Sequence, residues 1–262
     1  MIYLPDKKPL KKLITDTHAH YDDKRYDGER DALFSRLSEY GVDRVISCGC
    51  DIKSSKKCIE LSKSYSICYT AVGYHPCNLP NEDIDVLKIS ELAKNERVVA
   101  IGEIGLDYYW RQDNKEAQKR AFYQQLELAK AINLPVIIHD RDAHGDMMNI
   151  LKEQKPVGVV HCFSGSREMA EETVKLGLYI GIDGVLTFKN AKKLVEVAEA
   201  VPLDKILLET DAPYMAPEPY RGKTNNSALI LYVAERLAEI KKTSLEEVLC
   251  KTHKNAETLF KF

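Results

Sequence analysis

Histidines and carboxylates in this sequence stand at the ends of short apolar runs, where they could hold metal ions. The first such run ends in TDTHAH, residues 15–20. In an extended backbone, residues i and i+2 point to the same side, so His18 and His20 can converge on one ion. A His-x-His pair alone is equally compatible with a metal site and with two ordinary surface histidines.

The same arrangement recurs along the chain. Four more apolar runs end in a potential ligand: Glu103, His139, His161 and Asp211. An ionisable or imidazole side chain at the end of a buried run is costly unless it is paired or coordinated. Each of the four could by itself be a core residue whose polar group is hydrogen-bonded. Their position in the fold has to distinguish metal ligands from such core residues.

The elements that must position these side chains are short β-rich runs alternating with longer amphipathic stretches. Predicted strands cover residues 12–16, 44–48, 67–72, 98–103, 136–139, 158–161, 178–182 and 205–209. Predicted helices cover residues 28–40, 54–63, 83–95, 115–132, 143–154, 167–175, 191–200, 227–240 and 244–260. The strands are almost continuously hydrophobic, which is typical of parallel strands buried on both faces.

Eight consecutive βα units in a chain of 262 residues predict a TIM (β/α)8 barrel. A doubly wound open sheet is the alternative, but no linker or low-complexity tract marks the domain break that it would usually need. We therefore expect one barrel domain, residues 1–262. Barrel active sites form at the carboxyl ends of the strands, so His18, His20, Glu103, His139, His161 and Asp211 should surround one cavity. These side chains suffice for two divalent ions with a bridging carboxylate.

Several longer motifs resemble those of the TatD family of metal-dependent deoxyribonucleases, which are amidohydrolase-like barrels. The motifs are GYHP at 73–76, GEIGLDY at 102–108, HCFSG at 161–165, ETDAP at 209–213 and RGKxN at 221–225. His139, followed by RDA at 141–143, also matches. The resemblance covers nearly the whole chain. It implies that His18, His20, Glu103 and Asp211 hold one ion, and that Glu103 bridges to a second ion held by His139 and His161.

The sequence departs from the family pattern after Asn225. The family usually has an acidic residue followed by Pro there, whereas this chain has Asn226 and Ser227. We expect this loop to help shape the substrate end of the cleft, which makes a polynucleotide substrate less secure than metal binding.

The expected reaction is hydrolysis of a phosphodiester by attack of a metal-bound hydroxide on phosphorus. Glu103 is the expected bridge and Asp211 the expected general base. His75, in Tyr74-His75-Pro76, is at the active end without being needed as a ligand. It suits a phosphate contact or a proton donor to the leaving group, although a turn histidine fixed by the next proline is the alternative.

Three residues are candidates for substrate contact. Arg221 and Lys223 form a short basic loop that could bind phosphate, or could be an ordinary solvated charge pair. Trp110 follows the Glu103 strand and could stack on a base, or could cover the helix layer. DNA, as single strands or ends, is the expected partner.

Imidazole and carboxylate ligands accept Zn, Mn, Co or Ni, and Mg is compatible when waters complete its shell. The leading function is therefore a metal-dependent, exonuclease-type deoxyribonuclease. Hydrolysis of another ester or an amide is the second hypothesis, since this barrel type serves many substrates. A metal-stabilised binding protein without turnover is the third.

The composition agrees with an ordinary globular chain. The 38 Lys and Arg against 40 Asp and Glu give a formal charge of −2, which excludes a binder that depends on bulk positive charge. The apolar runs are too short to span a membrane. Seven cysteines without zinc-ribbon spacing favour reduced thiols and a cytoplasmic location. A monomer is compatible with the sequence, which does not fix the oligomeric state.

Overall fold

The computed structural model describes residues 3–6, 8, 11, 13–81 and 83–262. Its strands form one parallel sheet in chain order, from β1 to β8. A bridge between Ala19 and Ala212 joins the last strand region back to the first. The strands are β1 Ile14–Ala19, β2 Val42–Cys48, β3 Cys68–Val72, β4 Val98–Asp107, β5 Val136–Arg141, β6 Gly158–Val160, β7 Tyr179–Ile182 and β8 Ile206–Leu208. The predicted TIM barrel is confirmed.

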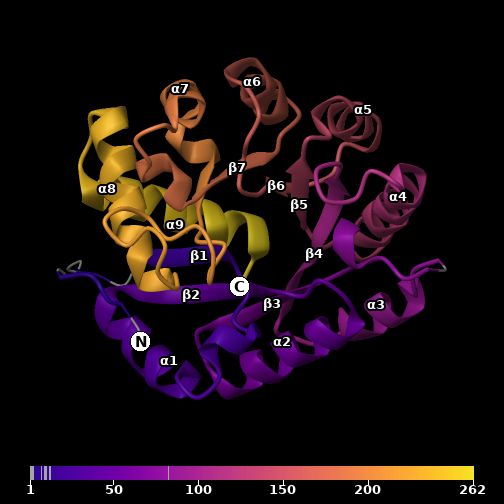
Figure 1. Ribbon diagram of the computed structural model, residues 1–262, viewed down its shortest axis with the longest axis horizontal. Coiled ribbons are helices and arrows are strands. Elements are labelled where there is room, and N and C mark those ends of the chain that lie inside the picture. The colour runs from indigo at the N-terminus through magenta and orange to yellow at the C-terminus, as the bar shows by residue number, and fades with distance from the viewer. Residues whose placement is uncertain (1–2, 7, 9–10, 12, 82) are drawn as a thin grey trace.

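Helices surround the barrel in chain order, as Figure 1 shows for α1 to α8. They are α1 Arg30–Leu37, α2 Ile52–Ser64, α3 Val86–Leu92, α4 Lys115–Ile132, α5 His144–Gln154, α6 Arg167–Lys175, α7 Lys192–Ala200, α8 Ile230–Lys241 and α9 Leu245–Phe260. None of the helices in the described part of the chain has both the length and the apolar character that a membrane span requires.

Alternation along the strands divides the core into two layers. Ile46, Ile137, Val159 and Leu207 form a small inner cluster inside the barrel. Val45, Ile138, Val160 and Leu208 belong to the larger cluster between strands and helices. Adjacent strand residues point to opposite faces, so both faces are buried and the strands read as continuous apolar runs.

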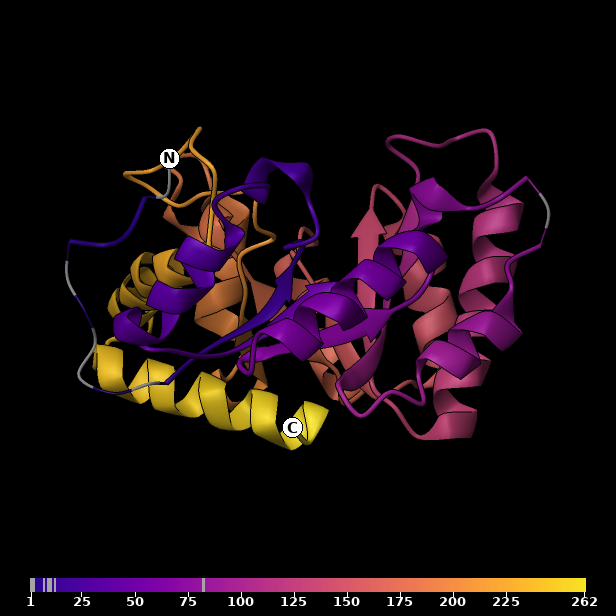
Figure 2. The same cartoon turned by 90° about the horizontal axis from the view of Figure 1, so that it is seen from below.

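The last helix closes one end of the barrel. Ala256, Leu259 and Phe260 of α9 pack in the inner cluster, and Figure 2 shows α9 along the lower edge of the molecule. The helix is capped by Ser244, whose Oγ accepts the N–H of Glu247 at 3.1 Å. The other end, at the carboxyl ends of the strands, is left to the loops.

The boundaries of several elements differ from those predicted. Strand β4 continues beyond Glu103 to Asp107, whereas β6 ends at Val160 and β8 at Leu208. The predicted 28–40 helix is α1 followed by a short 3-10 turn, Ser38–Tyr40. The predicted 83–95 helix is only α3, which Asp85 caps by accepting the N–H of Lys88. The predicted first residue of β1, Lys12, lies outside the described residues.

Candidate metal centre

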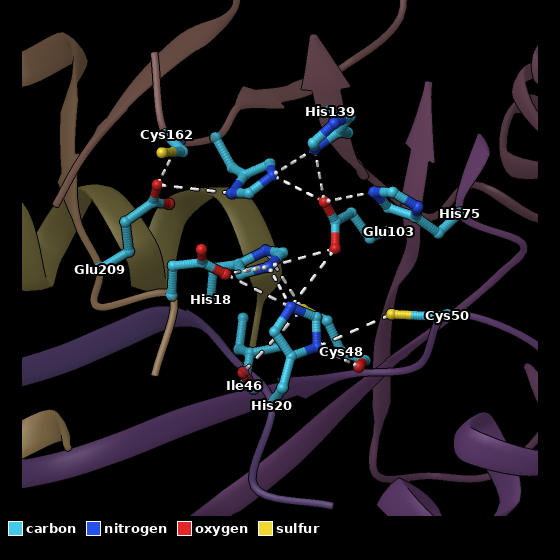
Figure 3. A network of polar contacts seen from close by, with 12 residues as sticks. His18, His20, Ile46, Cys48, Cys50, His75, Glu103, His139, Cys162 and Glu209 are labelled. Carbon is cyan, nitrogen blue, oxygen red and sulfur yellow. Dashed lines mark hydrogen bonds and ion pairs between the residues drawn. The ribbon is translucent and has the colours of Figure 1, made fainter. Parts of the chain in front are cut away.

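The carboxylate of Glu103 lies at the centre of the polar cluster at the open end of the barrel (Figure 3). Its Oε1 atom is 2.8 Å from Nδ1 of His139 and 2.8 Å from Nε2 of His161. Its Oε2 atom is 3.4 Å from Nε2 of His18 and 3.5 Å from Nε2 of His20. The two oxygens of one buried carboxylate therefore face two different pairs of histidines.

Asp211 completes the first group of possible ligands, which consists of His18, His20, Asp211 and Glu103 Oε2. Its Oδ1 atom is 3.6 Å from Nε2 of His18 and 3.4 Å from Nε2 of His20. Asp211 lies past the end of β8, in the left-handed region with φ of 53°, and its N–H donates to the carbonyl of His18 at 3.0 Å. This turn directs the carboxylate back over β1.

The second group consists of His139, His161 and Glu103 Oε1. Nδ1 of His139 lies 3.3 Å from Nε2 of His161. Strands β4 and β5 approach each other closely at this point because Gly105 has no side chain: an added Cβ would lie 2.0 Å from the carbonyl oxygen of His139, and φ is +145°. Any other residue would push the two ligand-bearing strands apart.

Cys48 contacts both histidines of the first group at Nδ1, the ring nitrogen that faces away from the cluster. Nδ1 of His20 is 3.0 Å from its carbonyl oxygen, and Nδ1 of His18 is 3.4 Å from its Sγ atom. An acceptor at Nδ1 leaves the Nε2 lone pair free to point into the cluster. A buried cysteine in an apolar strand carries no sequence signal for this role, and sequence reasoning missed it.

Two further carboxylates position the histidines of the second group. Asp107 Oδ2 lies 3.1 Å from Nε2 of His139, and Glu209 Oε1 lies 3.7 Å from Nδ1 of His161. Glu209 also accepts the backbone N–H of Cys162. Sequence reasoning quoted both carboxylates within motifs but assigned them no role. The sequence signal that could have identified them is their spacing: Asp107 is four residues after Glu103, and Glu209 is two residues before Asp211.

The electrostatics of the cluster favour a bound cation. Burial by itself would raise the pKa of Glu103, but the neighbouring imidazoles hold that pKa well below its usual range; they are His75, His161, His18 and His139. Burial would lower the pKa of His161, yet the Glu103 carboxylate raises it well above the ordinary value. An ionised carboxylate here therefore stabilises positive charge at its imidazole neighbours.

The donor geometry fits divalent ions. Metal–ligand bonds of about 2.1 Å in tetrahedral or octahedral geometry separate neighbouring ligand atoms by about 3.0–3.4 Å. The contacts among the ligand atoms of Glu103, Asp211 and the histidines range from 2.8 to 3.6 Å. The His18 and His20 Nε2 atoms lie 3.1 Å apart. Nδ1 of His20 faces the Cys48 carbonyl, which can only accept, so a neutral His20 ring has its lone pair on Nε2. A cation between the two Nε2 atoms would resolve this crowding.

His75 also contacts Glu103 but differs in its protonation. Its Nε2 atom is 3.4 Å from Glu103 Oε1, while its Nδ1 atom accepts the N–H of Cys77 at 3.1 Å. A neutral imidazole that accepts at Nδ1 carries its proton on Nε2. Burial lowers the pKa of His75, which favours this neutral form. His75 therefore presents the Nε2–H group to the cluster as a hydrogen-bond donor. It could bind a metal through Nε2 only after losing that proton.

The predicted substrate residues lie in three separate places. The Trp110 side chain is 67% exposed and packs edge-on against Tyr109. The guanidinium of Arg221 lies 4.3 Å from the centre of the Phe188 ring. The ammonium of Lys223 lies 5.5 Å from the centre of the Tyr3 ring. The structure does not bring Arg221 and Lys223 into contact with the six predicted ligands.

Asn226 and Ser227 are buried, each with at most 1% of its surface exposed. Ser227 Oγ donates to Asp16 Oδ2 at 2.6 Å, and Asn226 Nδ2 donates to the carbonyl of Tyr3 at 2.7 Å. Asp16 also accepts from the N–H of His18 at 3.3 Å. The two residues that depart from the family pattern therefore hold Asp16 of β1 and the backbone of Tyr3. That the loop shapes the substrate end stays a prediction.

A closed parallel barrel with a carboxylate between two sets of histidines, at the carboxyl ends of its strands, defines the class of metal-dependent barrel hydrolases. The family model described as TatD related DNase matches residues 15–261. The chain belongs to this TatD family.

Named relatives extend over almost the full chain. It is 42% identical over 253 residues to the Bacillus subtilis protein called uncharacterized metal-dependent hydrolase YabD, covering 95% of this chain and 99% of the other. It is 34% identical over 241 residues to the Shigella flexneri protein called 3'-5' ssDNA/RNA exonuclease TatD, covering 88% and 93%. The crystal structure of the Escherichia coli TatD homologue YjjV superposes with a TM-score of 0.90 at 33% identity, covering 95% and 98%.

Proposed function

We propose that this protein is a metal-dependent phosphodiesterase that degrades single-stranded DNA from its ends. The observation that carries the proposal is the Glu103 carboxylate. Its Oε1 lies 2.8 Å from both His139 and His161, and its Oε2 lies 3.4–3.5 Å from His18 and His20. This arrangement suits two divalent ions with Glu103 between them. A relative of similar length is named a 3'-5' ssDNA/RNA exonuclease, which supports the substrate class.

His18, His20, Asp211 and Glu103 would hold one ion, and His139, His161 and Glu103 the other. Two adjacent divalent ions supply a more acidic water and neutralise the phosphate charge that develops during hydrolysis. The protein's own contribution is to hold the ligands with their lone pairs inward. Cys48 and Asp107 do this through hydrogen bonds to the outer ring nitrogens.

Two side chains are assigned to proton transfer. The Asp211 carboxylate is partly accessible at the open end, and nearby His20 holds its pKa below the usual range although burial opposes this. An ionised Asp211 can accept a proton from the attacking water. His75 keeps its proton on Nε2 and can donate it to a phosphate oxygen or to the leaving alkoxide.

Trp110 is the proposed base-stacking residue. Its backbone N–H donates to Asp107 Oδ1 at 2.8 Å, so the turn that bears the indole is tied to the residue that positions His139. Arg221 and Lys223 remain candidates for contact with phosphates farther along the strand.

The test is a substrate panel with the purified protein loaded in turn with Mn, Zn, Co, Ni or Mg. We expect shortening of end-labelled single-stranded DNA, with slower loss of duplex DNA, and no activity after chelation. The panel includes RNA, bis(p-nitrophenyl) phosphate, amides, lactones and aminoacyl esters. Turnover of an amide or a carboxylic ester without any phosphodiester cleavage would contradict the proposal and favour the second hypothesis.

A further inference from the structure

Exposed aromatic side chains gather at the open end of the barrel. In the described part of the chain, the large apolar side chains that are most exposed are Leu87, Tyr109, Trp110, Val157 and Tyr214. Three of these, Tyr109, Trp110 and Tyr214, follow β4 or β8 at their carboxyl ends. Exposed aromatic groups beside a site indicate a surface that binds a ligand. Only Trp110 has so far been given a role.

Tyr214 is paired with an arginine from a distant part of the chain. The guanidinium of Arg25 lies 4.3 Å from the centre of the Tyr214 ring. Arg25 belongs to the short 3-10 helix Lys24–Tyr26 that follows β1, and its side chain is 45% exposed. Among the described residues it forms an ion pair with Asp23, whose Oδ1 is 3.9 Å from Nε. The guanidinium thus retains donors that can face a phosphate.

The same pairing occurs beside Trp110. The guanidinium of Arg141, at the end of β5, lies 4.6 Å from the centre of the Tyr109 ring. Tyr109 and Trp110 pack edge to face, with centres 4.8 Å apart. In each place the guanidinium covers one face of the tyrosine ring, while the tyrosine stays partly exposed, 50% for Tyr109 and 41% for Tyr214. The exposed part of the ring can stack on a base, and the guanidinium can pair with the adjacent phosphate.

Both tyrosines are held by short turns to carboxylate residues of the metal centre. Asp107 Oδ1 accepts the N–H of Tyr109 at 3.0 Å, while its Oδ2 faces His139. The carbonyl of Asp211 accepts the N–H of Tyr214 at 2.8 Å. The carbonyl of Tyr214 also accepts from Asn225 Nδ2 at 2.7 Å. The aromatic groups are thus fixed relative to the predicted ligands.

The two pairs lie on opposite sides of the barrel mouth. One pair belongs to the β4–β5 side and the other to the β8–β1 side of a barrel whose strands follow in chain order. In Figure 1 the helices that follow these strands, α4 and α8, are at opposite sides of the molecule. The Glu103 cluster lies between the two sides. A ligand that touches both pairs must be a chain that crosses the metal centre.

We infer that Arg25 and Tyr214 form a second nucleotide-binding site, across the metal centre from Trp110. A base of the single strand stacks on Tyr214 and the neighbouring phosphate pairs with Arg25. The inference rests on the proposed function and adds a subsite to it. This subsite would account for the exposed Arg25–Tyr214 pair at the β8–β1 side of the mouth, which resembles the Arg141–Tyr109 pair at the β4–β5 side.

The test compares a series of single-stranded oligonucleotides of increasing length with bis(p-nitrophenyl) phosphate, a small phosphodiester that has no nucleotide chain. The variants are Arg25→Ala and Tyr214→Ala, with Tyr214→Phe to keep the ring and Leu87→Ala as a control on an exposed apolar side chain of α3. Stacking losses of the usual size predict KM values about 5- to 100-fold higher on long oligonucleotides. We expect a much smaller change on the small ester, and near wild-type values for Tyr214→Phe.

Binding gives an independent measurement. Fluorescence anisotropy with labelled oligonucleotides and EDTA-treated protein should show the same weakening for Arg25→Ala and Tyr214→Ala, growing with strand length until both sides are reached. Equal losses on the oligonucleotide and the small ester, or oligonucleotide binding unaffected by both variants, would overturn the subsite. A wild-type protein that binds strands through Arg25 but cleaves no phosphodiester would instead overturn the proposed function alone.

Discussion

At the scale of single residues, the behaviour of this site depends on which nitrogen of each histidine carries the proton. The predicted ligands His20 and His139 face acceptors on their outer nitrogens, Cys48 O and Asp107 Oδ2. His75 instead accepts the Cys77 N–H with its outer nitrogen, so its inner nitrogen is protonated. Neighbouring imidazoles that contact the same Glu103 are thereby given different chemical roles.

Replacing His75 by Ala should separate these roles. We expect the metal content, measured by inductively coupled plasma mass spectrometry, to stay at the wild-type level. Loss of a positioned proton donor should lower kcat by about 100- to 10,000-fold. A variant that has lost one equivalent of metal would show that His75 is a ligand.

Asp211→Asn tests the proposed base. The amide keeps the size of the side chain and its position on the turn that ends with Tyr214, so the thermal unfolding midpoint should remain near that of the wild type. Turnover on single-stranded DNA should fall by about 100-fold or more because the amide cannot accept the proton. Full activity in this variant, at saturating metal, would contradict the assignment.

At the scale of elements, the loop after β4 links metal binding to substrate binding. Asp107 pairs with His139 through one oxygen and with the N–H groups of Tyr109 and Trp110 through the other. The pKa of Asp107 falls to about 2, because its hydrogen bonds to His139 and to these N–H groups outweigh its burial. A movement of the turn that carries Tyr109 and Trp110 would therefore shift Asp107 and, through it, the predicted ligand His139.

Asp107→Asn should weaken metal binding by about 10- to 100-fold, the usual cost of removing such a partner. The titration is followed by competition with a chromogenic chelator. Asp113→Asn, in the exposed part of the same loop, serves as the matched control and should bind metal like the wild type. Equal affinities for Asp107→Asn and the wild type would remove the positioning role.

The end of β7 should make stability depend on pH. Asp183 is buried, accepts from Cys162 Sγ at 3.1 Å, and has a pKa raised to about 7 by burial and by Glu209. The folded state keeps its proton where the unfolded state, with an ordinary pKa of 3.8, releases it. Stability should therefore fall as pH rises from about 4 to about 7, by up to about 4 kcal/mol.

Chemical unfolding of the metal-free protein at several pH values measures this slope. Asp183→Asn removes the titrating group, so its free energy of unfolding should vary less over this range and exceed that of the wild type at pH 7. The exposed Asp204→Asn variant should follow the wild type. Parallel curves for Asp183→Asn and the wild type would contradict the expectation.

At the scale of the whole molecule, a formal charge of −2 means that strand binding depends on a few local contacts. The candidate phosphate partners are Arg25, Arg141, Arg221 and Lys223. Two to four phosphate contacts predict that log Kd changes with log salt concentration with a slope of about 1.4–2.8. Anisotropy titrations of EDTA-treated protein measure the slope, and a value above about 5 would indicate a broader basic surface.

Much of this molecule followed from local sequence pattern. The eight strands, the barrel and the clustering of the six predicted ligands were expected because apolar runs report burial and strand ends converge in a barrel. Element boundaries were less certain, since Asp107 reads as the start of a loop although it ends β4.

Only the tertiary structure decided how these side chains are paired. Cys48 behind His18 and His20, Glu209 behind His161, and Arg25 over Tyr214 join residues that are far apart in the chain. The ligand histidines carry a local signal, but the residue that supports each of them is set by how the strands pack. The Arg25–Tyr214 contact in addition requires closure of the barrel, which brings β8 beside β1. The sequence by itself determined which elements form and which ligands are available. The tertiary structure determined which nitrogen of each histidine is protonated, which residues support the ligands, and which side chains surround the site.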